Sequence, residues 1–153
     1  MNPYEPPATA LPEPAPAASK RFRFVPVLVG GALIDFLGTN VVGFILASVV
    51  AAVLLAQGVS GGEVEKDLTT NPLLLAASYG LGAGLTLLGG YVAARWAGLR
   101  FVLHGAAAGA LSLALGLPFL FMATPWDWFV YVGLTIQVPL AAAGGWLAAR
   151  RVA

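Results

Sequence analysis

Four long stretches of apolar residues dominate this sequence and constrain its fold more than any other feature. They cover residues 24–56, 72–96, 101–122 and 128–149. About 20 apolar residues in a helix cross the hydrocarbon core of a bilayer, and a helix satisfies its own backbone hydrogen bonds there. With 59% hydrophobic and 10% charged residues, the chain is too apolar for a soluble domain. The pattern predicts an all-α membrane protein with four transmembrane helices.

The first apolar stretch is longer than one crossing requires. At ~1.5 Å per residue, residues 24–56 would extend about 50 Å as a helix, against a hydrocarbon core of about 30 Å. We therefore expect the first helix to tilt, to kink or to emerge from the bilayer.

The positions of lysine and arginine predict how the chain crosses the membrane. Only Lys66 falls on one side of the four predicted spans. The other basic residues flank the opposite side: Lys20, Arg21, Arg23, Arg95, Arg100, Arg150 and Arg151. Cytoplasmic loops carry the excess of positive charge, so both termini are expected in the cytoplasm.

Two segments lie outside the predicted spans. Residues 1–19 contain six prolines and almost no large apolar side chain, which predicts a disordered cytoplasmic tail that serves as a spacer or as a docking peptide. The transmembrane domain is then residues 20–153. Residues 57–71 form the longest polar connection, with carboxylates at Glu63, Glu65 and Asp67. Their spacing is not that of an EF-hand, so a solvated external loop is predicted rather than a calcium site.

Two pairs of matching segments predict an internal duplication. Residues 89–95 and 144–150 both read GG-aromatic-x-AAR, and a weaker match links residues 31–38 with residues 109–116. Such repeats predict two tandem helical hairpins that cross the membrane in the same orientation. Glycine and alanine are common here, so chance matches are the alternative explanation.

Small residues recur at helical spacing along the second, third and fourth spans. Helices in a bilayer associate mainly through close backbone approach, which small residues permit. The predicted helix-packing positions are Gly82, Gly89, Gly105, Gly109, Ser112, Gly116 and Gly144. These stripes would pack within the bundle, or else against a second copy of the chain or another membrane protein.

Asp35 is the most informative single residue. It lies eleven residues after Phe24, which is ~16 Å along the first helix and near the middle of the bilayer. A charged side chain there costs at least ~2.5 kcal/mol, so it should be protonated, paired or placed in a wet cavity. Gln137 is the expected partner. The hypothesis is a polar path formed by Asp35, Thr39, Asn40 and Gln137; the alternative is a set of interhelical hydrogen bonds that fix helix register.

Other chemistry finds little support in the sequence. There is no cysteine and one histidine, His104, which is expected to snorkel or cap near the inner interface. No motif for catalysis, a metal or a cofactor is present, so no enzymatic activity, metal site or cofactor is predicted. The net charge of +1 offers no basic field for nucleic acid, and the lipid bilayer is the expected partner.

Two short motifs resemble known proteins. The opening Met1-Asn2-Pro3-Tyr4-Glu5-Pro6-Pro7 resembles the start of many small bacterial membrane proteins. Residues 89–98, GG-aromatic-x-AAR-x-AG, look like a motif of small uncharacterised bacterial proteins with four transmembrane helices. The resemblance implies a bacterial inner-membrane protein and supplies no activity.

Three functional hypotheses follow. The first is a structural or partner-binding membrane protein, and the second is a small transport or permeation subunit for a proton, cation or small solute. The third is lipid or quinone binding between the helices. A solvent-reachable cavity between Asp35 and Gln137 would favour transport, and dry packing would favour a structural role.

Overall fold

Every regular element in the described part of the chain is a helix. The computed structural model describes residues 24–122 and 128–151, so the predicted tail and the turn at residues 123–127 lie outside the described residues. The helices are α1 (Phe24–Ala56), α2 (Gly61–Thr70), α3 (Pro72–Ala97), α4 (Phe101–Met122) and α5 (Trp128–Arg150). All except α2 are long and apolar enough to cross a membrane. The predicted class, an all-α membrane protein with four transmembrane helices, is confirmed.

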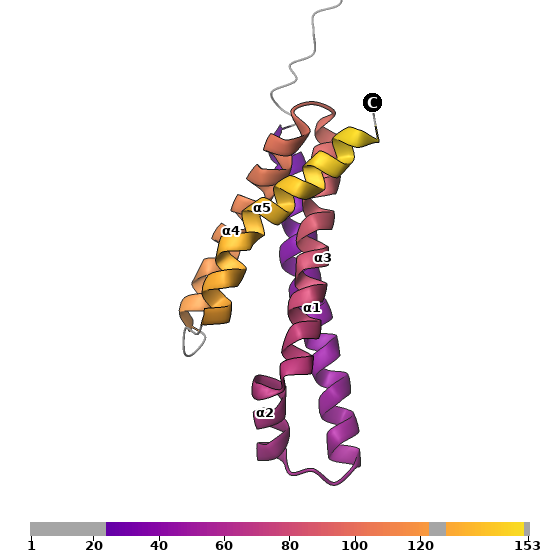
Figure 1. Cartoon of the computed structure of the whole chain (residues 1–153), viewed down its shortest axis with the longest axis vertical. Helices are drawn as coiled ribbons and strands as arrows, with labels where there is room; N and C mark the ends of the chain where they lie inside the picture. The colour runs from indigo at the N-terminus through magenta and orange to yellow at the C-terminus, as the bar shows by residue number, and fades with distance from the viewer. Residues whose placement is uncertain (1–23, 123–127, 152–153) are drawn as a thin grey trace, which may run out of the picture.

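The four long helices form two hairpins. The first hairpin consists of α1 and α3, connected through α2, and the second consists of α4 and α5 (Figure 1). Both hairpins begin and end at the same end of the molecule, as tandem units of one orientation would. We call this the basic end, because it holds Arg95, Arg100, Arg150 and Arg151, and we call the opposite end the α2 end.

The hairpins meet near the basic end and diverge away from it. Helix α3 is central, because it contacts α1, α4 and α5, and α1 also contacts α4. Towards the α2 end, α1 and α3 continue past the end of the second hairpin and pair only with each other and with α2 (Figure 1). Because α1 has 33 residues, it extends past the second hairpin as far as α2.

The polar connection at residues 57–71 is not the loop that its composition predicts, because α2 occupies most of it. The Glu63 carboxylate accepts hydrogen bonds from the Ser60 backbone N–H and the Ser60 hydroxyl at 3.2 and 2.8 Å. Ser followed three residues later by Glu is a signal for the start of a helix. The prediction of a loop considered only the polar composition and not this spacing. Val64 is buried and anchors α2 against the first hairpin.

Helix α3 has well-defined ends that set the geometry of its connections. The Asn71 side chain accepts hydrogen bonds from the backbone of Leu73 and Leu74, and Pro72 occupies the first helical position, where a missing N–H does no harm. At the other end Gly98 has φ +67° and closes the helix in the left-handed conformation that glycine favours. The short turn that follows starts α4 directly beside α3.

The glycines of the repeated motif lie where helices cross. A Cβ on Gly89 would lie 2.6 Å from the Gly31 carbonyl oxygen of α1, and one on Gly90 would collide with the Ala141 carbonyl of α5. In the second copy, a Cβ on Gly144 would collide with α3 and one on Gly145 with α4. Each copy therefore uses one glycine within its own hairpin and the other between the hairpins, although the order is reversed between copies.

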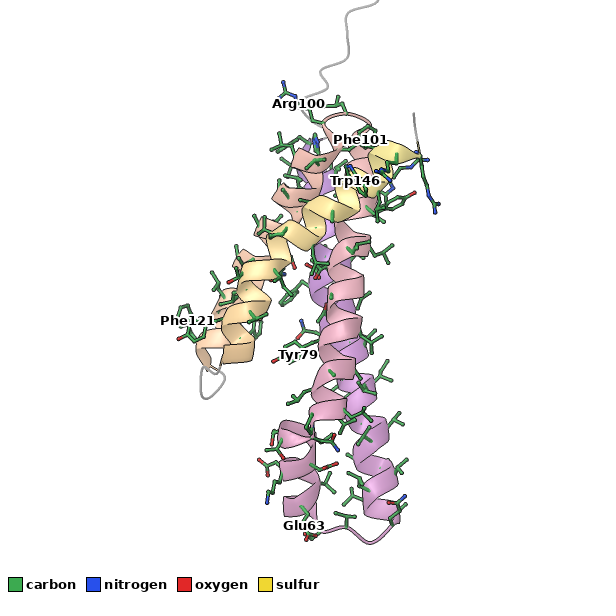
Figure 2. The ribbon with its side chains drawn as sticks, viewed as in Figure 1. Glu63, Tyr79, Arg100, Phe101, Phe121 and Trp146 are labelled. Carbon is green, nitrogen blue, oxygen red and sulfur yellow. The ribbon has the colours of Figure 1, made fainter. Side chains whose placement is uncertain are left out.

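The described surface and core have the distribution expected in lipid. The buried apolar residues are mostly small, such as Ala32, Ala93, Ala94, Ala108 and Ala141. Large apolar side chains point outward along all four long helices, with Phe44 75% exposed and Leu73 79% exposed. In Figure 2, Arg100 and Trp146 lie at the basic end and Glu63 lies at the α2 end.

Candidate functional site

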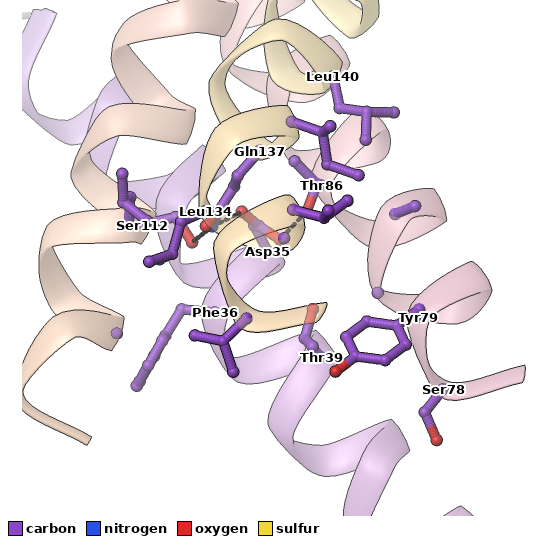
Figure 3. A pocket seen from close by; sticks show the side chains of 18 of the residues that line it. Asp35, Phe36, Thr39, Ser78, Tyr79, Thr86, Ser112, Leu134, Gln137 and Leu140 are labelled. Carbon is purple, nitrogen blue, oxygen red and sulfur yellow. Dashed lines mark hydrogen bonds between the residues drawn. The ribbon is translucent and has the colours of Figure 1, made fainter. Parts of the chain in front are cut away.

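A hydrogen-bonded cluster joins all four long helices. Asp35 of α1 accepts a hydrogen bond from the Thr86 hydroxyl of α3 at 2.7 Å. Its other carboxylate oxygen accepts from Gln137 Nε2 of α5 at 3.2 Å, and the same nitrogen donates to the Ser112 hydroxyl of α4 at 3.2 Å (Figure 3). We call these four residues the Asp35 cluster. The expected pairing of Asp35 with Gln137 is therefore present.

Three of the four residues of the Asp35 cluster are buried, and Gln137 is half-buried. The exposed fractions of Asp35, Thr86 and Ser112 are 3%, 6% and 2%. The Gln137 amide presents its nitrogen, rather than its oxygen, to Asp35, an arrangement in which the carboxylate accepts. Both described partners of the carboxylate are neutral, and every arginine or lysine that the structure describes is exposed. No cation in residues 24–122 or 128–151 balances Asp35.

A cavity of about 610 Å³ begins at the Asp35 cluster. All four cluster residues line it, and it continues between the hairpins to Ser78 of α3 and to Leu120 and Val130 near the far ends of α4 and α5. Most of the lining is apolar. The volume is within the range of about 300–1,000 Å³ that is typical of small-molecule sites.

Thr39 adds a polar group to the cavity wall. It lies one helical turn after Asp35 on the same face of α1 and lines the cavity. Its Oγ1 atom is buried and has no hydrogen-bond partner among the described residues. Tyr79 of α3 also lines the cavity and points towards the space between the hairpins (Figures 2 and 3). A buried hydroxyl without a partner is unusual, so the Thr39 hydroxyl is a candidate contact for a bound molecule.

The other predicted polar residue, Asn40, does not join the site. Its side chain is exposed and donates to the Phe36 carbonyl oxygen of its own helix at 2.7 Å. Asn40 follows Thr39 directly, so it is turned by about 100° around the helix axis and faces away from the cavity. Of the four residues proposed for a polar path, Asp35, Thr39 and Gln137 come together.

The predicted packing residues fall into two groups. Gly89, Gly105, Gly109 and Gly144 lie at close helix crossings, where an added Cβ would meet backbone or side-chain atoms of another helix. Ser112 is in the Asp35 cluster. Gly82 and Gly116 line the cavity instead, and a Cβ on Gly116 would have no neighbour within 4 Å. The stripes therefore pack tightly near the basic end and leave space further along.

His104 lies outside the cavity near the basic end. Its side chain is 4% exposed, its ring packs edge-on against Phe24 at 5.1 Å, and its Nδ1 lies 3.1 Å from the Arg100 carbonyl oxygen. A carbonyl only accepts, so Nδ1 carries the proton of this hydrogen bond. The Arg100 carbonyl oxygen already accepts from the His104 backbone N–H, so the ring adds a second hydrogen bond to the same oxygen and does not cap an unpaired group. His104 is therefore packed inside the bundle, unlike the snorkelling or capping side chain that the sequence predicts.

The aromatic positions of the repeated motif interact with arginines at the basic end. The Arg150 guanidinium lies 3.7 Å from the centre of the Trp146 ring, and the Arg151 guanidinium lies 6.0 Å from the Tyr91 ring. Such cation–π contacts hold charged groups beside amphipathic rings, which prefer the membrane interface. They mark the basic end as one surface of the membrane-embedded part.

Together these features define a class: a multi-pass helical membrane protein of two hairpins, with a buried polar cluster at one end of an apolar cavity. Among the described residues, no group of three or more His, Asp or Glu side chains could hold a metal ion. Comparison of the chain with protein-family models, curated proteins and solved structures found no match.

Proposed function

We propose that this chain is a non-enzymatic membrane protein with a structural or binding role, and that its binding site is the cavity between the hairpins. The observation that carries the proposal is the Asp35 cluster, to which each of the four long helices contributes one residue at the end of that cavity. The cluster fixes the position of each hairpin relative to the other, so the cavity has a defined polar end and apolar walls.

Energetic magnitudes favour binding over a purely structural role. A charged side chain at mid-bilayer costs at least about 2.5 kcal/mol. Interhelical hydrogen bonds in membranes average about 0.6 kcal/mol each, so the two bonds to Asp35 return about 1.2 kcal/mol. Apolar residues at position 35 and at the positions of its hydrogen-bonding partners would hold the helices at lower cost. The carboxylate at the cavity end is thus better explained by a molecule that it contacts.

Site-specific photocrosslinking tests the proposal. Leu113 and Leu115 are two residues apart on α4, but only Leu113 lines the cavity, whereas Leu115 is 39% exposed on the outside. A diazirine analogue of leucine at each position, irradiated in native membranes, should give adducts of one discrete mass from position 113. Position 115 should give a spread of bulk phospholipid adducts. The same bulk adducts from both positions would rule out a binding cavity.

A second candidate function is a small transport or permeation subunit that uses Asp35 and Gln137. It is favoured by the position of both residues at the polar end of the cavity. Between the cluster and the basic end, however, the helices pack closely. The residues Ala93, Ala94 and Ala141 there are 0% exposed. A path to the basic end would require the hairpins to separate there.

Flux measurements distinguish the two candidates. The full chain in proteoliposomes, with an internal pH-sensitive dye and an imposed proton gradient, should show no flux above protein-free liposomes if the cavity only binds. A transport subunit would show flux that Asp35→Asn abolishes. Glu65→Gln is the matched control, because it removes an exposed carboxylate from α2 without touching the cavity.

A further inference from the structure

The charge at the end of the cavity indicates the chemistry of its occupant. The Asp35 carboxylate has two neutral hydrogen-bond donors and no cation beside it among the described residues. Hydrogen bonds from neutral groups stabilise a buried carboxylate but leave its charge uncompensated, and buried charges in proteins are paired. A cationic group in the cavity would supply the missing charge. An anionic group would be repelled.

Thr39 places a second acceptor next to the first. Thr39 lines the cavity one helical turn from Asp35, and its Oγ1 atom is buried and has no partner among the described residues. An ammonium group has three N–H donors and no acceptor, so one head could donate to both the carboxylate and the Thr39 hydroxyl. A neutral alcohol could reach the same atoms but would leave the carboxylate charge unbalanced.

The rest of the cavity suits an apolar body. Apart from the cluster residues, the walls carry Leu113, Leu120, Leu134 and Leu140. The volume of about 610 Å³ is far larger than an inorganic cation requires. A small inorganic cation could use the oxygens of Asp35 and Thr39 at one end, but it would leave the leucine walls and most of the volume without a partner. The apolar walls therefore favour a cation that is itself largely apolar.

We infer that the cavity binds a lipophilic amine in its protonated form, with the ammonium head against Asp35 and Thr39 and the apolar body between the hairpins. The inference rests on the proposed binding role of this cavity and adds the class of ligand. It assigns Asp35 as the charge-recognition residue and Thr39 as an additional acceptor.

The test uses the full chain in phosphatidylcholine nanodiscs and three probes of one chain length: decylammonium, decanol and decanoate. Each is added at the same mole fraction in the bilayer, and the shift in unfolding temperature is followed by tryptophan fluorescence. Ligands that bind the folded state raise that temperature, and at equal concentration the ligand that binds more tightly raises it more. Decylammonium should bind at least about tenfold more tightly than decanol, at the lower end of what close charge pairs give, and decanoate should have no effect.

Two pairs of variants separate the charge from the cavity. Asp35→Asn should abolish the preference for decylammonium over decanol, whereas Glu65→Gln should keep it. Gly116→Leu should block all probes, because Gly116 lines the cavity and a Cβ added there would have no neighbour within 4 Å, which leaves the leucine side chain room to enter the cavity. Gly84→Leu is its control: a Cβ added at Gly84 would also have no neighbour within 4 Å, yet Gly84 does not line the cavity.

The outcomes distinguish the inference from the proposed function. If Gly116→Leu blocks the probes but decanol binds as tightly as decylammonium, the cavity is a binding site and the cationic ligand class is wrong. If Asp35→Asn keeps the preference for decylammonium, Asp35 is not the recognition residue and the inference fails. If Gly116→Leu leaves the binding of every probe unchanged, the proposed binding function fails as well.

Discussion

At the residue scale, the Asp35 side chain can affect the stability of the bundle in two ways, through its hydrogen bonds and through its charge. Two substitutions at position 35 separate these effects. Asp35→Asn keeps the shape and can still accept from Thr86, and the Gln137 amide can turn to present its oxygen to the new donor. Because the variant keeps most of these hydrogen bonds and removes the charge, whose burial costs at least about 2.5 kcal/mol, we expect Asp35→Asn to be at least as stable as the original chain. The measurement is reversible unfolding in mixed micelles.

Asp35→Leu is the informative comparison. It leaves the Thr86 hydroxyl and the Gln137 amide buried without their acceptor, which should destabilise the bundle by about 1–3 kcal/mol. Thr135→Ala serves as a control, because the Thr135 hydroxyl is exposed and bonds only to the Tyr131 carbonyl of its own helix. Equal losses from the Asn and Leu variants would show that the charge itself, rather than the hydrogen bonds, holds the hairpins together.

The sequence allows part of this site to be predicted. Asp35 and Gln137 stand out because long polar side chains in the middle of apolar spans are costly, and their pairing follows from their depth. Ser112 is predicted only as a packing residue and Thr86 is not among the predicted site residues, since a hydroxyl on a small-residue stripe looks like any other small residue. Whether their hydroxyls meet a partner depends on how far each helix is rotated, which one sequence does not determine.

At the element scale, the helix crossings near the basic end depend on the absence of a Cβ. Gly144→Ala should destabilise the bundle by about 1–3 kcal/mol, because the new methyl group would collide with the Leu87 carbonyl of α3 and neither backbone can yield easily. Gly84→Ala should be neutral or stabilising by up to about 1 kcal/mol, since alanine favours helix and the site is open. Unfolding in mixed micelles compares the two, and equal effects would contradict the close α3–α5 crossing.

Helix α2 provides a pH-dependent element outside the membrane-spanning helices. The pKa of Glu63 is held below its ordinary value of 4.5, first by the hydrogen bond from the Ser60 hydroxyl and then by that from the Ser60 backbone N–H. A carboxylate with a lowered pKa contributes stability that is present above its ordinary value and lost as the pH falls through the lowered one. Amide hydrogen exchange in α2 should therefore stay protected at neutral pH and lose protection below pH 4.5.

Two variants test the cause of that pH dependence. Ser60→Ala should weaken α2 protection at neutral pH and reduce its dependence on pH, because the larger of the two stabilising hydrogen bonds is gone. Glu65→Gln, which replaces an exposed carboxylate two residues further on, should change neither. An unchanged pH profile in Ser60→Ala would show that the Ser60–Glu63 pair does not hold the start of α2.

The elements themselves differ in how far the sequence predicts them. The long helices follow from apolar length alone, because a bilayer leaves the backbone no alternative partner. Helix α2 is short and polar, so it gives no hydropathy signal. Only the Ser60-x-x-Glu63 spacing indicates where it begins. The divergence of the hairpins also escapes prediction, since the same glycine-rich composition gives tight crossings at Gly90 and open space at Gly116.

At the scale of the whole molecule, three zones follow one another along the bundle. Near the basic end, alanines and glycines bring the hairpins into close contact; the Asp35 cluster comes next; the cavity lies beyond it. Small residues allow close contact but provide little directional preference, whereas the hydrogen bonds of the cluster fix one arrangement. The tight zone is thus the fixed base from which the hairpins diverge, and the cluster sets where the cavity begins.

The orientation of these zones in the membrane is the remaining prediction. Arg95, Arg100, Arg150 and Arg151 gather at one end, and Lys66 lies at the other, so the basic end should face the cytoplasm. Because the chain has no cysteine, single-cysteine variants report on one position each. Gly62→Cys, exposed on α2, should react with a membrane-impermeant maleimide in intact cells. Leu99→Cys, 44% exposed in the α3–α4 turn, should react only after permeabilisation, and the reverse pattern would place the cavity on the opposite side of the bilayer.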